Sequence, residues 1–385
     1  MSKLDLIATA TFGLESIVAE EVKQLGYEDV RVQNGRVEFT GDELAICRSN
    51  LWLRVADRVR LKVGEFKATT FDELFEKTKA LPWADILPMN AEFPVEGKSI
   101  KSTLFSVSDC QAIVKKAVVE SMKKKYKLDW FPEDGPLFKI EVALLKDIAT
   151  LTIDTSGPGL HKRGYRTLIS EAPLKETLAA AMLMLAKWYP DVALIDPFCG
   201  SGTIPIEAAL MGRNIAPGIN RDFACSDWPW IPQHAWKKAR EEAKDSIKHE
   251  KPEYIMGTDI DERVLRVARR NAEQAGVSED IHFQCMPVTE ISSKKKYGKI
   301  VCNPPYGERL SERREVNELY KDMAKTFKKL DTWSYYILTS HRGFEKIFGR
   351  EASKRRKLYN GNLEVQYYQY YGPRPPRIRR DTEEE

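Results

Sequence analysis

The stretch LIDPFCGSGTIPIEAALMG, residues 194–212, decides the fold of the C-terminal half of the chain. It begins at the end of an apolar run that has the length of a buried strand, and it closes with a longer apolar run that fits a helix. Between the two, Gly200 and Gly202 predict a tight turn, because glycine adopts backbone conformations that other residues avoid. The stretch therefore predicts a strand, a turn and a helix.

Strand-like segments continue this pattern toward the C-terminus. They lie at residues 254–260, 281–287, 299–305 and 334–340, with helical segments between most of them. Strands that alternate with helices form a mostly parallel sheet covered by helices. The C-terminal half is thus predicted to be an α/β domain of the doubly wound type.

The N-terminal half has a different pattern, and it divides into two small α+β modules. The first contains a strand, an amphipathic helix and two strands joined at Asn34-Gly35, a strong hairpin signal. The second contains two helices, a strand and an alternating segment that predicts a β-hairpin. We place the modules at residues 1–65 and 66–156 and the α/β domain at 157–385.

Composition narrows the class of protein. The chain has 385 residues and a net charge of +4, with 61 Lys and Arg against 57 Asp and Glu, so overall charge does not identify a nucleic-acid binder. The N-terminal segment is interrupted by Glu15, Glu20 and Glu21, which argues against a signal peptide or a membrane span. We therefore expect a cytoplasmic protein without membrane contact.

The cysteines show neither a CxxC pair nor a Cys/His spacing that would bind zinc. They are Cys47, Cys110, Cys199, Cys225, Cys285 and Cys302. Without a disulfide pattern they are expected to be buried thiols, and no metal site is expected.

The glycine turn is a candidate ligand site. Gly200 and Gly202 lack a Cβ where a ligand could approach the backbone, and a helix beginning near Thr203 offers unpaired N–H groups. The turn alone fits a plain strand-to-helix connection equally well. A nicotinamide-binding loop would need an acidic residue about 20 positions later. The next acidic strand end, Asp259, lies 59 positions after Gly200 (259 − 200), which disfavours that class.

Two aspartates follow this second strand. Asp259 is well placed to accept hydrogen bonds from ribose hydroxyls. Asp261 precedes the helical segment 262–276 and is expected to cap it, since aspartate accepts from the first free N–H groups of a helix.

The segment NPPY, Asn303–Tyr306, ends the fourth strand abruptly. Proline lacks the N–H group that a central strand needs, so the strand must stop at Cys302. A rigid turn with a surface tyrosine is the plainest interpretation, and a polar site held at the strand end is the other. Cys302 has no acidic or basic neighbour in the sequence to activate it, so we expect a buried strand residue rather than a nucleophile.

The order DPFCGSGT, GTDID, NPPY resembles the class I S-adenosylmethionine-dependent methyltransferases that act on exocyclic amino nitrogens of nucleobases. The resemblance implies a Rossmann-like domain with a mostly parallel seven-stranded sheet, and S-adenosylmethionine as cofactor. It assigns cofactor contacts to Asp196, Phe198, Gly200, Gly202, Thr203, Asp259 and Ile260.

The resemblance also assigns the catalytic segment Asn303, Pro304, Pro305 and Tyr306. A base amine is a poor nucleophile because its lone pair is delocalised into the ring. The Asn303 side-chain oxygen and the Pro304 carbonyl are the family's acceptors for the two amine hydrogens, and they stabilise positive charge that develops on the nitrogen. The prolines fix the carbonyl direction, and Tyr306 can stack on an extruded base.

One departure from the family concerns the cofactor's adenine. Many relatives end the third strand with an acidic residue that contacts adenine, whereas this chain has Met286 and Pro287 there. We therefore expect adenine to be bound by apolar groups or by the backbone.

The segments LHKRGYR and APLKETLAAA resemble a narrower group, the bacterial rRNA guanine-N2 methyltransferases with a ferredoxin-like region and an RNA-binding THUMP domain. This implies RNA as the partner, 23S rRNA or a precursor of the large ribosomal subunit, and guanine N2 as the target. Adenine N6 remains open, because NPPY serves both bases. A catalytically silent RNA-binding assembly factor is a further alternative.

Basic residues support an RNA partner. The candidates are Lys115, Lys123, Lys124, Lys125, Arg163 and Arg166. A lysine stripe can neutralise phosphates, although a solvated helix face has the same appearance. The segment with Arg163 and Arg166 lies near the cofactor in the family, so its charges could instead face the methionine carboxylate.

Overall fold

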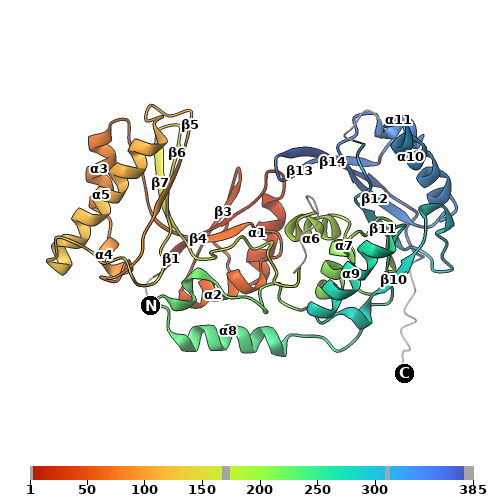
Figure 1. Ribbon diagram of the computed structural model, residues 1–385, viewed down its shortest axis with the longest axis horizontal. Helices are drawn as coiled ribbons and strands as arrows, with labels where there is room; N and C mark the ends of the chain where they lie inside the picture. The colour runs from red at the N-terminus through yellow and green to blue at the C-terminus, as the bar shows by residue number, and fades with distance from the viewer. Residues whose placement is uncertain (1–2, 167–173, 308–312, 377–385) are drawn as a thin grey trace, which may run out of the picture. The chain divides into compact units, whose positions relative to one another are not determined.

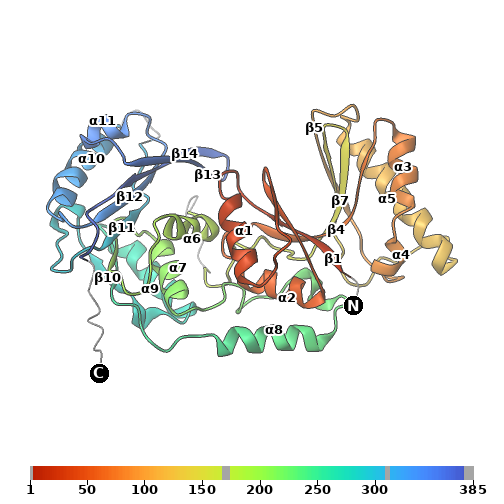
Figure 2. The same cartoon turned by 180° about the vertical axis from the view of Figure 1, so that it is seen from behind.

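A computed structural model describes residues 3–166, 174–307 and 313–376. The chain forms two compact units, each built from two separate segments (Figures 1 and 2). Unit 1 comprises residues up to Arg163 together with Ala216–Ser246. Unit 2 comprises Gly164–Ile215 and the residues from Ile247 onward.

Unit 1 contains a seven-stranded sheet in the order β2-β3-β1-β4-β7-β6-β5. The strands are β1 (Leu4–Thr9), β2 (Arg31–Gln33), β3 (Arg36–Gly41), β4 (Arg58–Lys67), β5 (Val95–Ile100), β6 (Ile140–Leu145) and β7 (Ile148–Asp154). Strand β4 pairs with β1 on one side and with β7 on the other, both antiparallel. The two α+β modules expected from the sequence therefore share one continuous sheet.

Helices cover this sheet where the sequence places apolar residues at helical spacing. They are α1 (Glu15–Gln24), α2 (Glu43–Trp52), α3 (Phe71–Lys79), α4 (Trp83–Ile86) and α5 (Val107–Tyr126). Helix α1 buries Ile17, Val18 and Val22. Helix α2 begins after Asp42, whose side chain accepts from the Ala45 N–H at 2.9 Å. Such a cap satisfies one of the four free N–H groups at a helix start.

Residues 216–246 complete unit 1, although the sequence pattern assigned them to the domain 157–385. Helix α8 (Gln233–Asp245) follows a short 3₁₀ helix, η1 (Ala224–Asp227), within this segment. Trp228 stacks on Phe138 at a centroid distance of 4.4 Å, and Arg48 pairs with Glu242 at 2.6 Å. Because residues 216–246 fold into unit 1, they lengthen the sequence spacing between the glycine turn and Asp259.

Unit 2 contains a second seven-stranded sheet, in the order β10-β9-β8-β11-β12-β14-β13. The strands are β8 (Leu194–Asp196), β9 (Ile255–Asp259), β10 (His282–Cys285), β11 (Lys299–Cys302), β12 (Ser334–Thr339), β13 (Lys354–Asn360) and β14 (Leu363–Tyr370). The first five run parallel, while β14 is antiparallel to β12 and to β13. The predicted mostly parallel seven-stranded sheet is confirmed. The hairpin of β13 and β14 was not predicted.

Helices cover both faces of this sheet (Figures 1 and 2). On one face lie α6 (Glu176–Leu185), α7 (Thr203–Gly212) and α9 (Glu262–Gln274), and on the other α10 (Arg313–Lys328) and α11 (Phe344–Phe348). Short 3₁₀ helices η2 (Ser278–Asp280) and η3 (Val288–Glu290) flank β10. The core between the sheet and α10 includes Ile300, Ile337, Tyr320 and Phe327.

Strands β9 and β10 continue the sheet from β8 to one side, and β11, β12, β14 and β13 continue it to the other. The strand order therefore reverses between β8 and β11. Ligands of open α/β sheets bind at such a switch point, outside the carboxyl ends of the strands. This is the edge at which the glycine turn, Asp259 and NPPY all lie.

From the sequence, we expected no membrane span and buried cysteine thiols. Among the described residues, every helix is too short or too polar to cross a membrane. All six cysteines are unpaired, and five are buried as expected. Cys285 is exposed and ends β10, which is an edge strand of the sheet in the part of the chain that the structure describes.

Candidate active site

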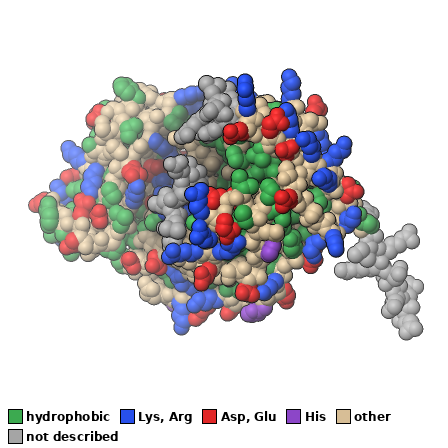
Figure 3. Space-filling model, turned by 45° about the vertical axis from the view of Figure 1, so that its right-hand side comes forward, with side chains coloured by type: hydrophobic (Ala, Val, Ile, Leu, Met, Phe, Trp, Pro, Cys, Tyr) green, Lys and Arg blue, Asp and Glu red, His purple; other side chains and the backbone are tan. Residues whose placement is uncertain are grey.

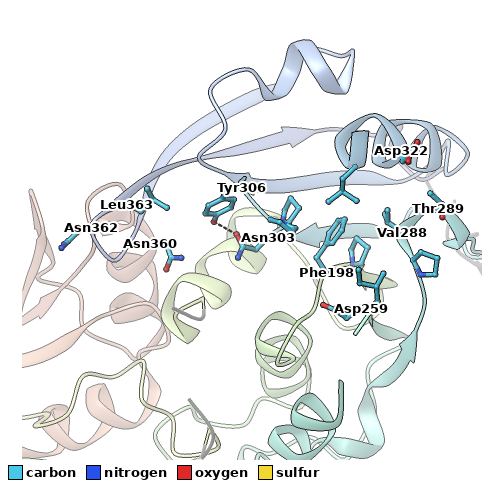
Figure 4. Close-up of a pocket in the computed structure, with 16 residues that line it drawn as sticks. Phe198, Asp259, Val288, Thr289, Asn303, Tyr306, Asp322, Asn360, Asn362 and Leu363 are labelled. Atoms are coloured by element: carbon cyan, nitrogen blue, oxygen red, sulfur yellow. Dashed lines mark hydrogen bonds between the residues drawn. The ribbon is translucent and has the colours of Figure 1, made fainter. Parts of the chain in front are cut away.

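A cavity of about 790 Å³ opens at the carboxyl ends of β8, β9 and β11 in unit 2 (Figure 4). Its lining brings together predicted residues from three separate segments: Phe198, Asp259, Ile260 and Asn303–Tyr306. Asp196, Gly200, Gly202 and Thr203 do not line this cavity. Their contacts instead stabilise the glycine turn next to the cavity.

Asp196 and Asp259 fix the turn between β8 and α7. The Asp196 carboxylate is buried and accepts from the Phe198 N–H at 3.1 Å. Asp259 accepts from the Gly200 N–H at 3.0 Å and from the Asp261 N–H at 3.1 Å. Burial, with the negative charge of Asp259 as a smaller cause, raises the pKa of Asp196 well above its ordinary value. Asp196 therefore stabilises the turn from its buried side and does not line the cavity.

The two glycines of the turn have different surroundings. Gly202 has φ +85°, and a Cβ there would lie 3.0 Å from the Ala268 Cβ of α9 and 3.2 Å from the Phe283 ring. Gly200 has φ +52°, yet no atom of the described residues lies within 4 Å of the position its Cβ would take. Packing therefore explains Gly202, while the open side of Gly200 is free for a ligand to approach the backbone.

Thr203 and Arg166 meet at the start of α7. Arg166 donates to the Thr203 hydroxyl at 2.5 Å and pairs with the buried Glu176 at 3.3 Å. Its side chain is only 14% exposed, so it is directed at the glycine turn. The alternative in which this segment serves the methionine carboxylate stays a prediction.

The NPPY segment continues from β11 into the cavity, and Cys302 just before it is fully buried. The Tyr306 hydroxyl donates to the Asn303 side-chain oxygen (Figure 4). From α10, the Tyr320 hydroxyl donates to the Pro305 carbonyl at 2.8 Å. Burial raises the pKa of the Cys302 thiol well above its ordinary value, which disfavours a reactive thiolate. The expectation of a buried strand cysteine is confirmed.

The cavity lining near Asp259 is mostly apolar. Ile260 is 76% exposed there, and Pro287 and Val288 follow β10. The apolar recognition of adenine stays a prediction. Thr289 and Asp322 add polar groups that the sequence analysis did not identify.

Other lining residues were also not predicted. They are Pro197, Leu319 on α10, and Asn360, Asn362 and Leu363 at the β13–β14 turn. No signal in the sequence placed this turn at the cavity.

The lysines of α5 have partners within unit 1. Lys115 pairs with Glu133 at 2.7 Å and lies 3.5 Å from the centre of the Phe93 ring. Lys123 pairs with Glu120 at 3.1 Å and Lys125 with Asp85 at 2.8 Å, while Lys124 is exposed. Lys and Arg are interspersed with Asp and Glu over the face in Figure 3. Exposed ion pairs are weak, so these lysines can still exchange partners with phosphates.

Arg163 differs from these lysines because it is buried, with 3% of its surface exposed. Its guanidinium donates to the carbonyls of Leu160 at 2.7 Å and Arg54 at 2.6 Å. The expected RNA contact does not agree with this burial. Arg163 holds the last residues of unit 1 in place.

Family comparisons match all three parts of the chain. The RMKL-like methyltransferase domain matches residues 163–369, the RlmL ferredoxin-like domain residues 5–60 and the THUMP domain residues 68–154.

Individual relatives match over nearly the full length. The Bacillus subtilis (strain 168) protein named "Putative RNA methyltransferase YpsC" is 54% identical over 100% of both chains. A Listeria monocytogenes structure, described as a predicted N6-adenine-specific DNA methylase, is 55% identical with a TM-score of 0.93, covering 97% of each chain. SMU.472, described as a putative methyltransferase complexed with SAH, is 46% identical with a TM-score of 0.92, covering 98% of this chain and 100% of that one.

Proposed function

The chain belongs to the RMKL-like methyltransferase family, with ferredoxin-like and THUMP domains preceding the methyltransferase domain, and from this premise we propose that it methylates guanine N2 in 23S rRNA. Its use of S-adenosylmethionine follows from the family and from the SAH-bound relative. The base and its location in the large ribosomal subunit are the proposed part. The observation that carries the proposal is the meeting of Asn303–Tyr306 with Asp259 in one cavity.

The cavity has two ends that suit two ligands (Figure 4). Near Asp259 it offers a carboxylate for ribose hydroxyls and the apolar surfaces of Ile260 and Val288 for a purine ring. S-adenosylmethionine supplies an electrophilic methyl group when it is bound there. Near Asn303 and Tyr306 it offers acceptors and an aromatic ring, which suit a nucleobase.

The chemistry proposed for the chain consists of positioning and electrostatic stabilisation. The Asn303 side-chain oxygen and the Pro304 carbonyl accept hydrogen bonds from the two hydrogens of the base amine, so that its lone pair points to the cofactor side. The same oxygens stabilise the positive charge that develops on nitrogen. The nitrogen becomes acidic as the bond forms, so that the proton leaves without a strong base.

The supporting groups hold this segment in a fixed orientation. Pro304 is buried, and the Pro305 carbonyl accepts from the Tyr320 hydroxyl, which is itself hydrogen-bonded with Thr339 at 3.0 Å. A preorganised acceptor loses little energy to reorganisation during the reaction. Tyr306 then stacks on the base.

Adenine N6 is the second candidate, because the Listeria relative is described as a predicted N6-adenine-specific DNA methylase. Both candidates use the same acceptors, so the product must decide. The purified protein is incubated with radiolabelled S-adenosylmethionine and RNA from cells lacking this protein. The RNA is then digested and its nucleosides are identified. Label in N2-methylguanosine of 23S rRNA supports the proposal, and label in N6-methyladenosine contradicts it.

A further inference from the structure

The turn between β13 and β14 forms one end of the cavity, on the side of Tyr306 and away from Asp259 (Figure 4). Asn360 pairs with Leu363 across the turn, and Gly361 has φ +62°. Strand β14 is hydrogen-bonded to β12 within the sheet. The turn is therefore attached to a rigid element, which suits a recognition site.

Asn360 has a half-buried side chain at this end of the cavity. Within residues 3–166, 174–307 and 313–376, no hydrogen bond joins its side-chain amide to another group. A primary amide has two donor hydrogens and an acceptor oxygen. Because Asn360 lines the cavity and is only half-buried, its amide donors and its acceptor are accessible to a ligand there.

We propose that Asn360 reads the Watson–Crick edge of the target guanine. Its amide oxygen accepts from N1–H and its amide N–H donates to O6, while Asn303 and Pro304 hold the adjacent N2 amine. When its N6 amine is held by Asn303 and Pro304, adenine presents an unprotonated N1 and then a C2–H group, so the same amide could form only one hydrogen bond, to N1. This inference rests on the proposed guanine-N2 function and adds to it the residue that selects the base.

The neighbours of Asn360 are consistent with this role. Tyr306 lies on the same side of the cavity and can fix the plane of the base by stacking, and Leu363 offers an apolar surface beside it (Figure 4). Asn362 is exposed, and its side chain points away from Tyr306. Asn362 also lines the cavity, so Asn362→Ala controls for a change in the turn that leaves the Asn360 amide in place.

The test combines a change in the protein with a change in the base. In a substrate RNA, the target guanine is replaced by 2-aminopurine, which keeps the 2-amino group but lacks O6 and N1–H. Methyl transfer to both RNAs is measured as kcat/KM for the wild type, Asn360→Ala and Asn362→Ala. A bidentate contact to a base edge contributes about 10- to 100-fold discrimination.

We expect the wild type and Asn362→Ala to favour guanine over 2-aminopurine by about 10- to 100-fold more than Asn360→Ala does. Intrinsic differences between the two amines cancel in this comparison. Asn360→Asp keeps the side-chain size and an acceptor for N1–H but loses the donor to O6, so it should keep only the part of the preference that depends on N1–H. Unchanged cofactor affinity shows that each variant is folded.

The role of Asn360 and the proposed guanine-N2 function are contradicted by different results. Equal discrimination by the wild type and Asn360→Ala, with N2-methylguanosine as the product, would overturn the role of Asn360 alone. Equal losses in Asn360→Ala and Asn362→Ala would also overturn it, because they would indicate a disturbed turn. N6-methyladenosine from the wild type would overturn the proposed function and this inference together.

Discussion

The Tyr306 hydroxyl donates a hydrogen bond to the Asn303 side-chain oxygen, the same atom that is proposed to accept from the base amine. In the free protein this bond occupies an acceptor position of the Asn303 oxygen. An entering base must take over the acceptor, and the tyrosine ring then becomes available for stacking. The hydroxyl and the ring of Tyr306 thus have separable effects.

Tyr306→Phe removes the competing hydroxyl and keeps the ring, so we expect methyl transfer at or above the wild-type rate. Tyr306→Ala removes the ring and should lower kcat/KM by about 5- to 150-fold, the usual range for a lost base-stacking contact. Steady-state assays of both variants on one RNA measure this difference. Equal large losses in both variants would show that the hydroxyl itself takes part in the reaction.

Asn303→Ala should lower kcat by about 100-fold or more, because it removes one of two acceptors that act on the developing charge. Cofactor affinity should remain unchanged, since the proposed cofactor end of the cavity lies near Asp259. Single-turnover methyl transfer and a cofactor titration measure the two quantities. Cys302→Ala is the matched control at the neighbouring position. It should keep activity, and its inactivity in a folded, cofactor-binding protein would support a covalent mechanism instead.

Alanine substitutions at the two turn glycines should affect different properties. Gly202→Ala combines a left-handed backbone with a contact of 3.0 Å to the Ala268 Cβ, so we expect a loss of about 1–3 kcal/mol in unfolding free energy. Gly200→Ala meets no other atom among the described residues and should destabilise less, but it places a methyl group where we propose that the cofactor approaches. Thermal melting and cofactor titration of each variant check this division. A larger stability loss in Gly200→Ala would contradict it.

The buried Glu21 in unit 1 should make stability depend on pH. Burial raises the pKa of Glu21 from an ordinary 4.5 to about 7, although its oxygens accept from the Arg54 and Val55 N–H groups at 2.8 and 3.1 Å. A raised native pKa means that the stabilising contribution is complete below pH 4.5 and is lost as pH rises through about 7. The loss is on the order of 3 kcal/mol between these limits.

Urea unfolding of the wild type and Glu21→Gln at several pH values between 4.5 and 8 measures this contribution. Glu21→Gln should lose the pH dependence, while a constant cost remains because glutamine has only one acceptor oxygen for two N–H groups. Parallel pH profiles for the two proteins would contradict the assignment to Glu21.

The sequence was informative where functional residues are contiguous and follow a strand. Asn303–Tyr306 and the glycine turn could be placed because proline and glycine constrain the backbone locally. Asp261 was expected to cap a helix, and it accepts from the Arg263 N–H at 2.8 Å at the start of α9. Local rules suffice for such features because all partners lie within a few residues.

Features that depend on distant partners could not be predicted. Tyr320 reaches Pro305 from a separate helix, and Asn360 enters the cavity only because β14 pairs with β12. The lysines of α5 appeared to be a free basic stripe, but Lys115 meets Glu133 and Lys125 meets Asp85. Sequence spacing does not show which charges meet in space.

The insertion at residues 216–246 determines when unit 1 can finish folding. During synthesis, the sheet of unit 1 is complete once β7 has emerged, yet Phe138 still lacks Trp228 as its stacking partner and Arg48 lacks Glu242. The ribosome must first make β8 and α7 of the other unit. A fragment truncated after residue 156 would therefore leave Phe138 and Arg48 without these partners. A fragment beginning at residue 157 would contain Trp228 and Glu242 but not the part of unit 1 that they contact.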